Sequence, residues 1–113
     1  MPHVVIDGAI DLRAFAQSFA PLHITETGDV LKTECVYIER SGRALVIEAL
    51  AIEARRTQKF YVRVAAQDRG SVSVRIDPLT KPERSEGVKR IVACIGSSIA
   101  MDRGRCIRSG GRT

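Results

Sequence analysis

The chain begins Met1-Pro2-His3-Val4-Val5-Ile6-Asp7-Gly8, and its expected fold is built outward from this stretch. Three consecutive β-branched residues closed by Asp-Gly predict a short buried strand. If Met1 is removed, Pro2 becomes the amino terminus and carries a free secondary amine, which is a base and a nucleophile. A chain end tied into a strand is unusual, because termini normally fray. We therefore predict a strand that holds the Pro2 nitrogen in a pocket, the alternative being an ordinary chain start.

An amphipathic helix is predicted to follow, over residues 9–20. Its apolar residues recur at helical spacing; they are Leu12, Phe15, Ala16 and Phe19. Pro21 ends the helix, because the residue before a proline avoids the α region. The polar segment 23–29 that comes next is interpreted as a loop.

The middle of the chain is predicted to be a series of strands. These strands are expected over residues 30–40, 44–52, 60–66 and 71–77. Residues 44–52 alone also fit a short helix, but the Ser41-Gly42 turn signal before them favours a hairpin with the preceding strand. The basic segment 54–59 is interpreted as a loop.

A second helix is predicted after Thr80-Lys81-Pro82-Glu83, which fits a capping box. Apolar residues then recur at helical spacing; they are Val88, Ile91, Val92, Ile95 and Ile99. Gly87 and Gly96 each weaken a helix by up to about 1 kcal/mol relative to alanine. Either glycine could instead mark a close contact between helix and sheet.

This order of elements predicts one α+β domain over residues 1–100. A two-layer sandwich with both helices on one face of the sheet would bury both sets of apolar side chains. The other face of the sheet would then need a partner, which favours an oligomer.

Composition narrows the class of protein further. No apolar run is long enough to cross a bilayer and no secretory signal is recognisable, so a cytoplasmic location is expected. The three cysteines are odd in number and form no CxxC pair, which indicates neither a metal site nor a disulfide framework. The formal charge is +5, of which residues 101–113 carry +3. This basic Gly/Arg-rich tail is expected to be disordered.

The start Met1-Pro2-His3, the apolar strand, Gly8, the amphipathic helix and a strand ending Val36-Tyr37-Ile38-Glu39 together resemble the tautomerase superfamily. The likeness is greatest to the branch of 5-carboxymethyl-2-hydroxymuconate isomerases. It covers about residues 1–100, and the segment around Val74-Arg75-Ile76 is similar to the start of that branch's second β-α unit.

The resemblance implies paired β-α-β units with two helices on one face of a mixed sheet, assembled as a homotrimer. It also implies loss of Met1, no cofactor, and Pro2 as the general base in a keto-enol shift on a small unsaturated keto or enol acid. Such a shift needs a base near neutral pH and positive charge beside the developing enolate. Burial and nearby cations lower the pKa of an amine of this kind. The substrate-binding candidates are Lys32, Tyr37, Arg40 and Arg75.

One departure from the family pattern leaves other functions open. Glu34 occupies the strand position at which family members often carry an arginine, and its charge does not suit a carboxylate substrate. This favours a second hypothesis, a non-catalytic oligomeric binding or assembly protein on the same scaffold. A third, a nucleic-acid binder using Arg55, Arg56, Lys59 and the tail, lacks a recognised motif and an aromatic platform for bases.

Overall fold

The fold is described from a computed structural model of the chain. The structure describes residues 3–8, 10–26, 28–54, 56–67, 70–83 and 85–112, and of residue 3 and residues 102–112 it describes the backbone alone. The prediction that Pro2 is held in a pocket lies outside these residues. Arg55, one of the candidate nucleic-acid contacts, also lies outside them.

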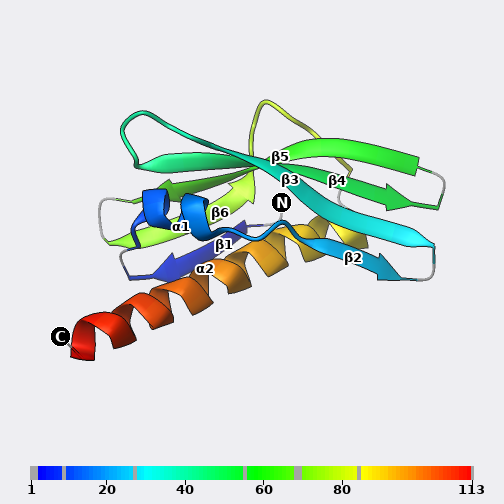
Figure 1. The fold of residues 1–113 in the computed structure, drawn as a ribbon. Helices are drawn as coiled ribbons and strands as arrows, with labels where there is room; N and C mark the ends of the chain where they lie inside the picture. Colours follow the sequence, from blue (N-terminus) through cyan, green and yellow to red (C-terminus); the bar gives the residue numbers. More distant parts are fainter. Residues whose placement is uncertain are drawn as a thin grey trace.

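Six strands and two helices make up the described residues (Figure 1). In chain order they are β1 (His3–Asp7), α1 (Leu12–Ser18), β2 (His23–Glu26), β3 (Asp29–Ile38), β4 (Ala44–Glu53), β5 (Arg56–Ala66), β6 (Ser71–Ile76) and α2 (Glu86–Arg112). The strands form one sheet in the order β1-β6-β5-β4-β3-β2, and each of the five pairings is antiparallel. The first strand, β1, therefore forms one edge of the sheet and lies next to the last strand, β6.

The expected mixed sheet of paired β-α-β units is wrong. Parallel neighbours need a long crossover, whereas short turns join β2 through β6 into consecutive antiparallel hairpins. The helix α1 connects β1 and β2, which lie at opposite edges of the sheet, so it does not link adjacent parallel strands. Because α2 follows the last strand, the described residues contain no second β-α-β unit.

The core lies between the inner face of the sheet and α2, which crosses beneath it (Figure 1). One face of α2 is fully buried through Val88, Ile91, Ile95 and Ile99. The helix packs against β1, β4 and β6, and α1 adds Leu12 and Phe15 to the same core. The hairpin of β3 with β4 is confirmed, because Ile38 to Val30 pairs with Leu45 to Ile52 across one bulge.

Two segments predicted as loops are wholly or partly strands. Residues 23–26 form β2, which pairs with β3 from His23–Lys32 to Glu26–Asp29. Arg56 to Lys59 begin β5 and pair with the end of β4. Both segments are polar because they lie at an edge or on the outer face, so the hydrophobic alternation that marks a half-buried strand is weak there.

The predicted capping box is also wrong, because α2 begins at Glu86 rather than beside Thr80. The Thr80 hydroxyl instead accepts the Tyr61 N–H at 3.2 Å and donates to the Asp77 carbonyl at 3.1 Å. Residues 77–83 thus run along β5 before the chain turns into the helix. At its other end α2 continues to Arg112 and contains most of the predicted tail, whose disorder stays a prediction.

Candidate functional site

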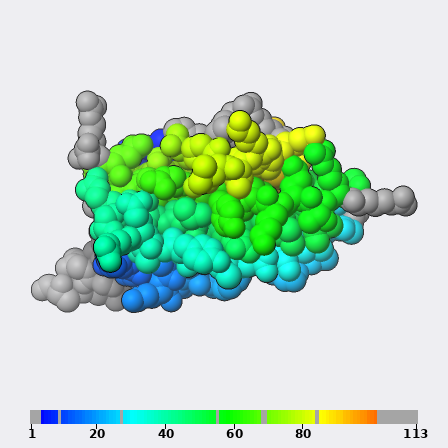
Figure 2. All heavy atoms as spheres, turned by 90° about the horizontal axis from the view of Figure 1, so that it is seen from above, coloured from blue at the N-terminus to red at the C-terminus, as the bar shows by residue number. Residues whose placement is uncertain are grey.

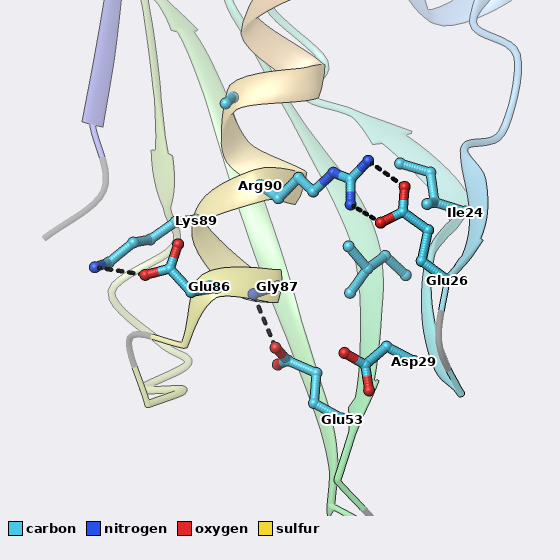
Figure 3. A pocket seen from close by; sticks show the side chains of 10 residues that line it. Ile24, Glu26, Asp29, Glu53, Glu86, Gly87, Lys89 and Arg90 are labelled. Atoms are coloured by element: carbon cyan, nitrogen blue, oxygen red, sulfur yellow. Dashed lines mark hydrogen bonds and ion pairs between the residues drawn. The ribbon is translucent and has the colours of Figure 1, made fainter.

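A cavity of about 490 Å³ opens between the β2–β3 hairpin, the end of β4 and the first turns of α2 (Figure 3). We call it the α2 cavity. Its lining residues are Ile24, Glu26, Asp29, Leu31, Glu53, Glu86, Gly87, Lys89, Arg90 and Ala93. They come from three segments that are far apart in the sequence, residues 24–31, residue 53 and residues 86–93, so the cavity exists only in the folded chain.

The β2–β3 hairpin supplies one wall. Gly28 adopts a φ of +86° in its turn, a conformation that L side chains rarely adopt. The hairpin register then places Ile24 opposite Leu31 and Glu26 opposite Asp29. This arrangement puts apolar side chains toward the floor of the cavity and two carboxylates at its rim (Figure 3).

The half-buried Glu53, at the end of β4, caps the amino end of α2. Its Oε1 accepts the Ser85 hydroxyl at 2.5 Å, and its Oε2 accepts the Gly87 N–H at 2.9 Å. The Ser85 oxygen in turn accepts the Val88 N–H at 3.2 Å. The first amides of a helix have no partner within it, and a negative charge there also interacts favourably with the helix dipole. The Glu53 side chain is therefore committed to holding α2 against the sheet.

A bidentate ion pair between Arg90 on α2 and Glu26 on β2 closes another side of the cavity. The two N–O distances are 2.9 and 3.0 Å (Figure 3). The Arg90 guanidinium lowers the pKa of Glu26, and the Glu26 carboxylate raises the pKa of Arg90. Because the pair is solvent-exposed, its contribution to stability is small. That contribution is present at neutral pH and is lost as the pH falls through the lowered pKa of Glu26.

The lining carries four carboxylates against two basic side chains, a formal charge of −2 in a chain whose formal charge is +5. Glu26 and Glu86 pair with Arg90 and Lys89, and Glu53 caps the helix. Within the described part of the chain, the Asp29 carboxylate makes no hydrogen bond or ion pair. Asp29 therefore remains as a free acceptor at the rim.

The residues predicted as substrate ligands do not line this cavity. Lys32, Tyr37 and Arg75 lie on the outer face of the sheet, on strands β3 and β6. Arg40 follows β3 in the turn to β4, where its carbonyl accepts the Arg13 guanidinium at 2.6 Å. The structure does not gather these four side chains into one pocket, and their role in binding stays a prediction.

Tyr37 and Arg75 nevertheless share one row across the outer face. His3 pairs with Arg75, Arg75 with Arg63, Arg63 with Val46 and Val46 with Tyr37. The Cys35 thiol and the Glu48 carboxylate beside Tyr37 raise its pKa to about 12.

The sequence carried one usable signal for the α2 cavity, the glycine at position 87. A Cβ there would lie 2.6 Å from Glu53 Cδ and 2.7 Å from Leu31 Cδ2, so the predicted close contact of helix and sheet is confirmed. Glu26, Asp29, Glu53 and Arg90 gave no signal, because nothing in their local sequence distinguishes them from ordinary surface charges. Only the pairing of β2 with β3 and the docking of α2 bring them together.

Comparison with protein-family models, curated proteins and solved structures finds no match to this chain. The likeness to tautomerases therefore rests on the residues alone and stays a prediction. Among the described residues, no group of three or more metal-ligating side chains could hold a metal ion. Over the same residues, no helix combines the length and apolar character needed to span a membrane.

Proposed function

We propose that the protein is a small-molecule binding module that takes its ligand in the α2 cavity. The observation that carries this proposal is the cavity itself. Its volume of about 490 Å³ falls within the range of roughly 300–1,000 Å³ that is usual for ligand sites. Ile24, Leu31 and Ala93 give it apolar surface, and charged side chains surround that surface. This corresponds to the binding-protein alternative drawn from the sequence.

The charges of the cavity favour a ligand with an apolar body and a cationic or N–H-donating group. The lining has a formal charge of −2, so its field attracts cations and repels carboxylates. The unpaired Asp29 carboxylate can accept an N–H from such a ligand. Arg90, the only arginine among the lining residues, is paired with Glu26. Its guanidinium is therefore poorly placed to bind an anionic ligand.

Benzylamine and benzoate, which are similar in size and opposite in charge, test this proposal. Benzylamine should shift the methyl NMR signals of Ile24 and Leu31 in a saturable titration, whereas benzoate should leave them unchanged. Ala93→Phe, which fills the cavity from the surface of α2, should abolish the shifts. Ser97→Phe is the matched control, because Ser97 is exposed one turn further along α2 and does not line the cavity.

The contribution of Asp29 is tested separately. Asp29→Asn should weaken binding of benzylamine more than binding of the uncharged benzyl alcohol, because it removes the unpaired negative charge and keeps the shape. Equal shifts with amine and carboxylate, or shifts that survive Ala93→Phe, would contradict the proposal.

The second candidate function is the Pro2-dependent isomerase expected from the sequence. It is supported by the strand register, which places Arg75 opposite His3 and Arg63 opposite Arg75. Arg75 thus belongs to the strand next to the residue that follows Pro2, and Arg63 belongs to the strand beyond it. Positive charge in that region is what an enolate-forming reaction needs. The homotrimer and the cytoplasmic location belong to this second candidate alone.

For this candidate, intact-mass measurement of the native protein should show loss of Met1, and phenylenolpyruvate should be turned over. Pro2→Ala should abolish that turnover, because alanine supplies a primary amine in place of the cyclic secondary amine. Arg75→Gln should reduce it. Lys81→Gln, an exposed change away from β1, is the control. Retention of Met1, or full activity of Pro2→Ala, would eliminate the isomerase.

A further inference from the structure

The central strand β4 is apolar on both faces. Its inward residues Leu45, Ile47, Ala49 and Ala51 are buried in the core. Its outward residues are Val46, Glu48, Leu50 and Ile52, three of which are aliphatic. An antiparallel sheet with one face in water normally alternates apolar with polar residues, whereas a strand covered on both faces is a nearly continuous apolar run. The composition of β4 therefore indicates a covered outer face.

Neighbouring strands extend this apolar surface. Val30 pairs with Ile52, Tyr61 with Glu48 and Tyr37 with Val46. Tyr37 is 54% exposed. Figure 2 shows this face of the sheet from above, and within the described residues neither helix crosses it. The outward aliphatic residues of β4 are half-buried, and a second chain packed on this face would complete their burial.

The charges on this face are separated in a way that fits a second copy of the chain. Basic side chains lie on β5 and β6, at Lys59, Arg63 and Arg75. Lys59 pairs with Glu48 and Arg63 pairs with Glu39 within the same copy, so Arg75 is the one of the three that is left for a partner. Acidic side chains lie on β3 and β4, at Glu34 and Glu48, with Lys32 as the exception near the β2 edge. Arg75 and Glu34 are both exposed, and within the described residues neither forms an ion pair.

A two-fold axis parallel to the strands, between β4 and β5, makes these charges complementary. It lays β6 of one copy over β3 of the other, because the strand order runs β6-β5-β4-β3. Arg75 then meets the Tyr37 ring of the second copy, since both belong to the same cross-strand row, with Glu34 beside it. A guanidinium over an aromatic ring is favourable, and an isologous interface forms each such contact twice.

The area approaches that of a standard interface. β3 and β4 have 10 residues each, β5 has 11 and β6 has 6, so at about 3.4 Å per residue and about 4.8 Å between strands the flat footprint is roughly 600 Å². Side chains add to this area, and a standard interface buries about 800 Å² per partner.

We propose that two copies of the chain pack face to face through the outer faces of β3, β4, β5 and β6, as a two-fold dimer. The α2 cavity lies between the sheet and α2, away from this interface, so the inference does not depend on the proposed ligand. The dimer buries the apolar residues of β4 and pairs Arg75 with the acidic side of the other copy.

Sedimentation velocity of the purified full chain tests the dimer. The wild-type protein should sediment as a dimer, and Leu50→Asp should shift it to a monomer with an unchanged far-UV circular dichroism spectrum. Leu79→Asp is the matched control, because Leu79 is 93% exposed but does not belong to the four strands. It should remain dimeric.

A charge exchange identifies the orientation of the two copies. Arg75→Glu and Glu34→Arg should each weaken the dimer at least tenfold, because each places like charges together across the interface. The double variant should restore association. A monomeric or trimeric wild-type protein, a dimer that survives Leu50→Asp, or a double variant no tighter than the single ones would overturn the proposal.

Discussion

Replacing Glu53 with alanine should lower the free energy of unfolding by about 1–3 kcal/mol, because a half-buried helix end loses its acceptor. The carboxylate accepts the Ser85 hydroxyl and the Gly87 N–H, and both groups lie where α2 meets β4. Removing one partner of a buried hydrogen bond leaves the other unsatisfied, which costs more than the net value of the bond. The alanine variant also loses the favourable interaction of a negative charge with the helix dipole.

Urea unfolding followed by circular dichroism measures this effect. Glu53→Gln is the matched variant, because it keeps the side-chain length and one carbonyl acceptor while removing the charge. It should lose less stability than Glu53→Ala. Each kcal/mol corresponds to a fall in Tm of about 4–8 °C for a domain of this size. An alanine variant with an unchanged midpoint would show that Glu53 does not cap α2.

Gly87→Ala should lower the free energy of unfolding by up to about 2 kcal/mol, although alanine is the better helix former. Helix propensity alone favours alanine by about 1 kcal/mol. The added Cβ would lie 2.6 Å from Glu53 Cδ and 2.7 Å from Leu31 Cδ2. Leu31 is buried and Glu53 is held by its hydrogen bonds, so neither can move cheaply. Overpacking of this kind costs about 1–3 kcal/mol and outweighs the gain in propensity.

Gly96→Ala provides the internal control on the same helix. Its Cβ would lie 3.2 Å from Val4 Cγ1, and Val4 belongs to the edge strand β1, which is paired along one side. A small shift of β1 accommodates the methyl group, so stability should be unchanged or should rise by up to about 1 kcal/mol from helix propensity. Combining Gly87→Ala with Glu53→Ala should lower the free energy of unfolding by less than the sum of the two single changes. The reason is that Glu53→Ala removes the carboxylate with which the new Cβ at position 87 would clash. If the two changes in free energy were strictly additive, the close contact between Gly87 and Glu53 would be contradicted.

The elements with strong local patterns were recoverable from the sequence. The alternation in residues 60–66 and 71–77 and the helical spacing from Val88 to Ile99 correspond to β5, β6 and α2. The hairpin of residues 30–40 with 44–52 was also correct, because the Ser41-Gly42 turn limits how the two strands can pair. The secondary-structure predictions that were wrong concern polar segments of the chain. β2 carries little apolar pattern, and its existence depends on its pairing with β3.

The candidate site was less predictable than the strands. The site residues predicted from the sequence were Pro2 and several cations, which are chemically distinctive residue types. The α2 cavity uses ordinary carboxylates whose importance depends on where they meet. Glu53 and Ser85 are 32 positions apart, and Glu26 and Arg90 are 64 positions apart. No spacing rule connects residues at such separations.

The amino-acid sequence by itself determined which segments are apolar and where they alternate, because side-chain periodicity is a local property of strand and helix. Only the tertiary structure decided that β1 closes against β6 in an antiparallel sheet and that Glu53 meets the first turn of α2. Those contacts join distant parts of the chain, and their free energy comes from burial that no local segment achieves alone.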